Sequence, residues 1–566
     1  MNDNHLIMKL AKYLIICALS MGMMACSDGP GGPSTKHPNG EDPDQPEQPG
    51  DNDDPEDDVK SPTPTFTLST EKATVDPEKK IQEMEGFGAS DCWLPNQIGQ
   101  YWTANRQQLA QWLFSQTISK DGNPEGIGLS MWRVNLGAGT AEQGDKSNMQ
   151  ANNRAESYLT DGSYNWNKCA GQRYFMQQAK INGVEKFVLF SNSPLVQYTR
   201  NGMGYSDNGG STNLKDDCYD DYAEYMAEVA NYFVKSGYNI SHISPVNEPQ
   251  YDWGVDASGT ASQEGCGWTN AQVARLTREL DKSLESRGLN TMISMGEAAS
   301  WEYMYSNSNS SRARANTIDA FFNPESDAYV GDLKHVGNLT CGHSYWTFDN
   351  WSHMRNIRKK VKDAAAARGL RVWQTEWSML DKEPSELGGS YDDVTEFDIA
   401  QYMSRIIHCD ITMAGCTSWS YWTAMSVERW SQKNRFELIK TTPAGGNYSD
   451  DFTAEGKIEA TPNLWVLGNY SLFVRPGYYL CGLDIKEDKD FFGTAYIAPD
   501  KSRLVLVITN YDKKNGVTID MVVPEGAKSV YRYTTTSAKH LKQERFSLKD
   551  KVFVEPKSVT TIVYNF

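Results

Sequence analysis

The feature that most constrains this chain is an alternation of short apolar runs with longer amphipathic stretches, beginning near residue 85. Such short runs are typical of buried parallel strands, and the amphipathic stretches between them are typical of crossover helices. We expect strands at residues 86–90, 127–136, 186–191, 243–247, 292–296, 339–345, 372–376 and 417–422. We expect helices at residues 218–236, 270–287, 354–368 and 395–413.

Eight strand–helix repeats predict an α/β chain with a (β/α)8 TIM barrel at residues 85–468. An open doubly wound sheet is the alternative, but no Gly-rich dinucleotide fingerprint follows its first strand. Beyond residue 468 the helical pattern stops and alternating apolar runs predict a C-terminal β-sandwich side domain at 469–566. Residues 65–84 are also strand-like, and we expect them to join that side domain.

The first 26 residues have the pattern of an export signal. Lys9 and Lys12 precede a mostly apolar run that is too short to span a membrane. The run ends at Ala25-Cys26, and a small residue directly before a Cys resembles a bacterial lipoprotein cleavage site. We therefore expect residues 1–26 to be a lipoprotein signal peptide with Cys26 as the lipidated residue. An ordinary secretory signal with an incidental Cys is the alternative.

Residues 27–64 predict a disordered, acidic, Pro-rich linker. Residues 28–60 hold eleven acidic residues and two lysines. Their net charge of −9 is half of the chain's net charge of −18. A segment of this composition cannot bury a core and stays extended. The remainder is only mildly acidic and lacks the clustered Lys and Arg of a nucleic-acid surface. We expect an exported monomer whose one membrane contact is a lipid anchor in the outer membrane, at the cell surface or on its periplasmic face.

Two glutamates follow apolar strands at predicted barrel ends, where barrel enzymes carry their sites. Glu248 lies in an Asn247-Glu248-Pro249 turn after the fourth strand, and Glu376 ends the seventh strand between two tryptophans. A glutamate is most often a solvated surface charge, but neither of these has a solvated-helix context. Two carboxylates about 5–5.5 Å apart across a glycosidic bond give a retaining glycosidase. The sequence therefore predicts a retaining glycoside hydrolase.

These turns resemble the large clan of retaining (β/α)8 glycosidases and, within it, glycoside hydrolase family 30. Three further motifs carry the narrower resemblance over roughly residues 66–566. They are Glu85–Asp91 at the first strand, Ser191–Pro194 with Asn201-Gly202 after the third, and the β-module joined through residues 469–477.

The resemblance implies roles for individual residues. Glu248 would be the acid/base and Glu376 the nucleophile. Asn247 would bind the sugar 2-hydroxyl, Arg133 would hold the nucleophile ionised, and Asp91 would bind hydroxyls of the sugar being cleaved. For Arg133 the alternative is a purely structural ion pair.

Four more residues depend on the exact strand register, because neighbours along a strand alternate in and out. Either His343 or Tyr345 on the sixth strand would support Glu376. Trp419 or Trp422 on the eighth would form the floor under the sugar.

The Asp91 version of the first strand, with Asn192 where several branches carry Trp, most resembles the branch that cleaves β-1,6-galactan. The implied activity is that of an endo-β-1,6-galactanase acting on arabinogalactan-type side chains by double displacement. Branches acting on β-1,6-glucan, glucuronoxylan, fucosides or glucosylceramide are alternatives.

Aromatic residues make up 11% of the chain, and five tryptophans follow predicted strand ends. Each is either a sugar platform or part of the core. They are Trp93, Trp102, Trp253, Trp268 and Trp301.

Two other classes of function compete with a glycosidase. A non-catalytic surface glycan-binding lipoprotein would share the anchor and the aromatics, but it has no need of both glutamates. A Ser- or metal-dependent hydrolase is disfavoured because no GxSxG elbow or HExxH helix occurs. We expect no cofactor and no catalytic metal.

Overall fold

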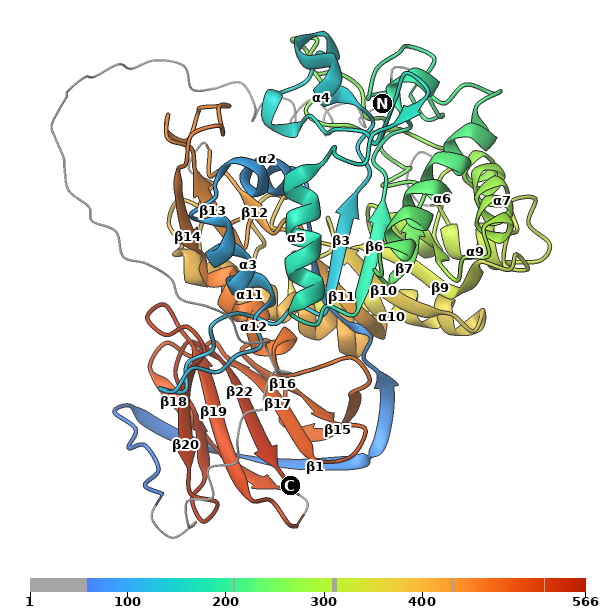
Figure 1. Ribbon diagram of the computed structural model, residues 1–566. Coiled ribbons are helices and arrows are strands. Elements are labelled where there is room, and N and C mark those ends of the chain that lie inside the picture. Colours follow the sequence, from blue (N-terminus) through green and yellow to red (C-terminus); the bar gives the residue numbers. More distant parts are fainter. Residues whose placement is uncertain (1–58, 207–208, 308–312, 430–431, 524) are drawn as a thin grey trace, which may run out of the picture.

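The computed structural model describes residues 59–566 except 207–208, 308–312, 430–431 and 524 (Figure 1). The predicted signal peptide, Cys26 and most of the predicted linker lie outside these residues. In the part of the chain that is described, no helix combines the length and apolar character needed to cross a membrane.

Eight parallel strands close into a barrel in the order β10-β11-β2-β3-β6-β7-β8-β9. They are β2 (Gly86–Ser90), β3 (Met131–Asn135), β6 (Lys186–Phe190), β7 (Ile240–Ser244), β8 (Met292–Ala298), β9 (Val336–His343), β10 (Arg371–Glu376) and β11 (Cys416–Tyr421). Each overlaps one predicted run, and the bounds differ most at β3, β7 and β9. The predicted TIM barrel is confirmed.

Helices cover the outside of this barrel (Figure 1). The long ones are α5 (Ala170–Ile181), α6 (Tyr219–Lys235), α7 (Asn270–Ser286), α10 (Trp351–Ala367) and α11 (Glu396–Cys409). Shorter ones are α2 (Leu94–Tyr101), α3 (Arg106–Phe114), α4 (Thr140–Gln143), α8 (Glu302–Tyr305) and α9 (Thr317–Phe322). Local signals fix the start of α7, where Thr269 and Gln272 form a capping box.

The barrel interior is narrow and filled by side chains. Met131, Val188, Leu339, Cys341 and Trp373 form a small buried cluster inside it. A packed interior leaves no pore, so polar chemistry is confined to the open end where the strands finish.

The second domain is a nine-stranded sheet in the order β20-β19-β22-β17-β16-β15-β1-β18-β21. Strand β1 (Thr67–Glu83), which precedes the barrel, lies inside it, antiparallel to β15 (Tyr479–Ile485) and parallel to β18 (Asn515–Val522). The other strands are β16 (Phe491–Ile497), β17 (Arg503–Asn510), β19 (Ser529–Thr535), β20 (Lys542–Phe546), β21 (Val552–Val554) and β22 (Ser558–Asn565).

The two ends of this sheet fold over a common core, which confirms the predicted sandwich. The rings of Phe546 on β20 and Phe553 on β21 meet edge to face, with centroids 5.4 Å apart. Phe66 meets Phe553 in the same way, with centroids 5.5 Å apart. Arg532 of β19 donates to the Phe553 carbonyl at 2.7 Å, so opposite edges of the ladder are in contact.

Helix α12 (Pro462–Ser471) links the two domains, and the predicted boundary at residues 468–469 falls inside it. Asn469 donates to the Thr535 hydroxyl at 2.7 Å and accepts from the Thr561 hydroxyl at 3.0 Å. These bonds fasten the helix to the sandwich. Two small sheets were not predicted: β4 (Leu159–Thr160) with β5 (Ser163–Tyr164), and β12 (Met425–Ser426) with β13 (Ile439–Thr442) and β14 (Lys457–Ala460).

Candidate active site

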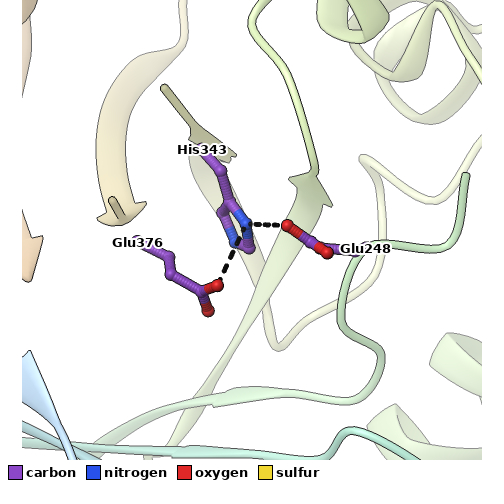
Figure 2. A group of neighbouring side chains, drawn as sticks. All are labelled: Glu248, His343 and Glu376. Atoms are coloured by element: carbon purple, nitrogen blue, oxygen red, sulfur yellow. Dashed lines mark hydrogen bonds and ion pairs between the residues drawn. The ribbon is translucent and has the colours of Figure 1, made fainter. Parts of the chain in front are cut away.

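The two predicted catalytic glutamates lie together at the open end of the barrel. Glu376 is the last residue of β10, and Glu248 follows the end of β7; they are 4% and 7% exposed. His343, the last residue of β9, points between them (Figure 2). Its Nδ1 lies 2.8 Å from Oε1 of Glu248 and 3.7 Å from Oε1 of Glu376. The facing atoms of all three side chains lie within 4.8 Å of one another.

Arg133 on β3 approaches the same group from the opposite wall. It donates to Oε2 of Glu376 at 2.6 Å and to the Asn247 side-chain oxygen at 2.9 Å. Its guanidinium stacks on the Phe190 ring at 3.7 Å. A buried guanidinium with fixed hydrogen bonds is a strong support for an anionic carboxylate. The structure thus places Arg133 against Glu376, with Asn247 bonded to the same guanidinium.

Glu297 on β8 completes the network and is a residue that sequence reasoning missed. Its fully buried carboxylate lies 3.1 Å from Nε2 of His343 and 3.4 Å from Nη2 of Arg133, and it accepts from the Thr375 hydroxyl at 2.7 Å. Burial raises the pKa of Glu297, but Arg133 and His343 outweigh burial and lower the pKa to about 2. Glu297 follows directly after the predicted strand at 292–296, so the rule that found the other two glutamates would also have found it.

His343 is a buried imidazolium in this network. Burial alone lowers its pKa, but the surrounding carboxylates of Glu376, Glu248 and Glu297 raise the pKa to about 10. With Arg133, the cluster holds two cations. The carboxyl groups of Glu248, Glu297 and Glu376 face these two cations, which offset most of their negative charge.

The hydrogen bonds distinguish the two candidate catalytic carboxyls. Both oxygens of Glu376 accept, Oε2 from Arg133 and Oε1 from the Tyr345 hydroxyl at 3.1 Å. Burial raises the pKa of Glu376 overall, against the lowering effect of His343 and Arg133. The two fixed donors nevertheless stabilise the anionic form of Glu376, whereas the one described hydrogen bond to the Glu248 carboxyl comes from His343. The hydrogen bonds therefore suit Glu376 as the anion and Glu248 as the acid.

Buried polar atoms lacking a described partner lie beside β2 and β6. Oδ1 of Asp91 accepts from the Asn135 backbone at 2.8 Å, while Oδ2 has no partner among the described residues. Burial raises the pKa of Asp91 to about 7. Asn192 donates to the Asn135 side chain at 3.2 Å, and its own oxygen is likewise unpaired within the described chain. Unpaired buried polar atoms of this kind are candidates for binding sugar hydroxyls.

Of the two residues predicted for the sugar floor, Trp419 does not fit, because alternation along β11 turns it outward. Its indole donates to Asp410 at 2.8 Å in the layer outside the barrel. Ser418 and Ser420, its neighbours along the strand, instead lie against Met131 in the interior. Trp422 meets Trp93 edge to face, with centroids 5.4 Å apart, and also the Phe190 ring at 6.4 Å.

Of the other loop tryptophans, three belong to the core. Trp102, Trp268 and Trp301 are almost completely buried, so they offer no face to a sugar. Trp253 is different: its indole donates to the Glu248 backbone carbonyl at 3.2 Å.

Backbone strain gathers around these side chains. Glu248, Trp253, Glu297 and Trp346 all adopt left-handed backbone angles, with φ of 43°, 52°, 41° and 59°. Residues other than glycine rarely adopt this conformation, and proteins concentrate it at functional sites.

The side chains of Glu248, His343 and Glu376 could in principle hold a metal ion. One possible ligand atom from each of the three lies within 4.8 Å of the other two. However, a metal ion there would lie close to the Arg133 guanidinium, which already supplies positive charge to Glu376. The residues present therefore fit a metal-free site.

Comparison with known proteins agrees with this geometry. The family model for O-glycosyl hydrolase family 30 matches residues 70–434. An endo-β-1,6-galactanase of Hypocrea rufa is 27% identical over 467 residues, which covers 79% of this chain and 83% of that protein.

Solved structures share the whole two-domain architecture. A conserved exported protein from Bacteroides fragilis is 28% identical, with a TM-score of 0.78 over 87% of this chain and 100% of the other. The catalytic domain of xylanase C from Talaromyces cellulolyticus is 19% identical, with a TM-score of 0.60 over 88% of this chain and 100% of the other. The barrel, its paired carboxylates and the matched family model lead to one conclusion: this chain is a glycoside hydrolase that belongs to O-glycosyl hydrolase family 30.

Proposed function

We propose that this glycoside hydrolase is an endo-β-1,6-galactanase that cleaves arabinogalactan-type side chains with retention of configuration. The carrying observation is the pair Glu248 and Glu376, whose facing oxygens lie within 4.8 Å of each other around His343. The similarity to the Hypocrea rufa endo-β-1,6-galactanase supports the choice of sugar. Asp91 and Asn192, with their unpaired oxygens, are the candidates for binding that sugar.

The proposed reaction has two displacements. In the first, a Glu376 oxygen attacks the anomeric carbon while Glu248 gives its proton to the departing glycosidic oxygen. In the second, Glu248 takes a proton from water, and that water breaks the glycosyl ester on Glu376. Arg133 and Tyr345 hold Glu376 in position, and Asn247 stands beside Arg133 to meet the 2-hydroxyl.

The substrate is tested by digesting β-1,6-galactan, β-1,6-glucan and glucuronoxylan side by side and sizing the products. We expect a ladder of oligosaccharides from β-1,6-galactan and little release from the others. A faster digestion of β-1,6-glucan or glucuronoxylan would contradict the proposed sugar. Release of only a monosaccharide or disaccharide from the outset would contradict endo action.

We also propose that the mature protein is a monomer tethered to the outer membrane through Cys26. The export pattern of residues 1–26 and the acidic linker support this localisation. Labelled palmitate should enter the wild-type protein and not the Cys26→Ser variant, and the variant should leave the membrane fraction. Equal labelling of both would contradict the anchor, and a dimer by light scattering would contradict the monomer.

A further inference from the structure

Trp346, which no catalytic role explains, lies at the edge of the active site. It follows Tyr345, whose hydroxyl bonds Glu376, and the two rings have centroids 5.9 Å apart. Its side chain is 41% exposed, an unusual position for a tryptophan so close to buried carboxylates. An exposed indole beside a sugar-cleaving pair offers a flat apolar face to a pyranose ring.

The surrounding loops hold this indole in a fixed place. The Trp346 backbone has φ of 59°, which a bulky side chain rarely adopts. Its backbone N–H donates to the Asp381 carboxylate at 2.6 Å. Arg435 in turn donates to the carbonyls of Leu380 and Asp381, both at 3.1 Å. A strained backbone held by a carboxylate and an arginine indicates a built platform rather than a loose loop.

The strand order places this indole away from the side of the barrel that carries the hydroxyl-binding candidates. Asp91 and Asn192, the buried hydroxyl-binding candidates, belong to the β2 and β6 side of the barrel. Trp346 follows β9, and Asp381 follows β10, on the other side. Burial raises the pKa of Asp381 to about 7, and the negative charge of the nearby Glu248 adds to this increase. Glu248 is the group that protonates the departing sugar, so the platform adjoins that sugar.

We infer that Trp346, positioned by Asp381, is the stacking platform for the sugar on the leaving-group side of the scissile bond. The inference rests on the proposed function, because it assumes that Glu248 is the acid. It explains endo action: a site that binds sugars on both sides of the bond selects the interior of a chain. It also predicts transfer, in which an acceptor sugar on Trp346 attacks the glycosyl ester through its hydroxyl oxygen. That hydroxyl gives its proton to Glu248, and the Glu376 carboxylate leaves.

The test compares two substrates that differ only on the leaving-group side. β-1,6-Galactan places a sugar on Trp346, whereas β-1,6-galactobiosyl fluoride has only fluoride there. Trp346→Ala should lower kcat/KM on galactan at least about ten-fold and leave the fluoride rate within about two-fold. Trp346→Phe should recover most of the loss, and Asp381→Ala should show a smaller loss with the same selectivity. The matched control is Ile181→Ala, an equally simple truncation of a 68% exposed side chain at the end of α5, just before β6.

A second readout is the ratio of transfer to hydrolysis when galactobiose is added to the fluoride reaction. Trp346→Ala should lower this ratio, which a general loss of folding would not do. An unchanged rate on galactan, or equal losses on both substrates, would overturn the inference. The wild-type rate on galactan tests the proposed function separately. If the wild type cleaves another polymer, the same comparison of Trp346→Ala with wild type on that polymer and on its glycosyl fluoride decides the role of Trp346.

Discussion

Replacing Glu297 by Gln tests the buried charge network most sharply, because Glu297 balances both of its cations. The change keeps the shape of the side chain and removes one negative charge. In the folded protein the carboxylate contacts His343 and Arg133, and it accepts from Thr375 and Ser244. The amide cannot accept at both of its ends, so at least one donor loses its partner.

The structure also gives the size of the effect. The pKa of Glu297 is lowered from 4.5 to about 2 in a completely buried position. At about 1.4 kcal/mol for each pH unit, this corresponds to about 3 kcal/mol of stability at neutral pH. Loss of one partner from a buried ion pair costs about 3–5 kcal/mol, which agrees. Because the pKa is lowered, this stability is present above about pH 4.5 and is lost as pH falls toward 2.

The assay is urea unfolding of wild type and Glu297→Gln at pH 7, with Glu325→Gln as a control for an exposed glutamate. We expect the free energy of unfolding to fall by about 3 kcal/mol in Glu297→Gln and to stay unchanged in the control. The variant should also lose the upper end of its stable pH range. His343 contributes stability that is present below about pH 6.5 and is lost as pH rises through about 10. Removing Glu297 should bring that loss to lower pH. A variant as stable as wild type, with the same alkaline limit, would refute the buried charge network.

Three further predictions follow from the site. Asp91→Asn should flatten the pH dependence of the free energy of unfolding. The raised pKa of Asp91 gives stability that is present below about pH 3.8 and is lost as pH rises through about 7. Parallel curves for wild type and variant in pH-dependent unfolding would argue against this. Trp419→Phe should lower the free energy of unfolding by about 1–3 kcal/mol through the lost bond to Asp410, with KM unchanged; a large rise in KM would return Trp419 to the sugar site. Chelation with EDTA should leave the hydrolysis rate unchanged, because Arg133 and protonated His343 supply the positive charge; inactivation that zinc or calcium reverses would contradict a metal-free site.

Much of this fold could be predicted from sequence because periodicity alone carries it. The eight apolar runs are long enough to identify buried parallel strands, and all eight became barrel strands. Glu248 and Glu376 were found because a carboxylate directly after an apolar strand is unusual. Glu297 meets the same criterion, because it directly follows the predicted strand at residues 292–296, so the sequence carried the signal for it as well.

The remaining features depend on information that periodicity does not contain. Inward and outward positions along β11 differ by one residue, and the register of β11 is fixed only by its pairing with β10 and β2. The sequence alone therefore cannot tell whether Trp419 faces the open end of the barrel or the layer outside it. Trp102, Trp268 and Trp301 follow strand ends as Trp253 does, yet they are almost completely buried. The place of Trp346 depends on Asp381 in a loop after a different strand, a pairing that no local pattern reveals.

The central claim is that Glu376 forms a covalent bond to the sugar. It is tested most directly by trapping the enzyme with 2-deoxy-2-fluoro-β-galactobiosyl fluoride, or the corresponding fluoride of the polymer that it cleaves, followed by intact mass and peptide mapping. The fluorine at position 2 destabilises the charged transition states of both steps, while the good fluoride leaving group lets the ester accumulate. We predict a mass increase of one fluorinated glycosyl unit on the peptide containing Glu376, absent in Glu376→Gln and slow to decay until an acceptor sugar is added. An adduct on another residue, or inverted stereochemistry in the first product of an active enzyme, would contradict the account.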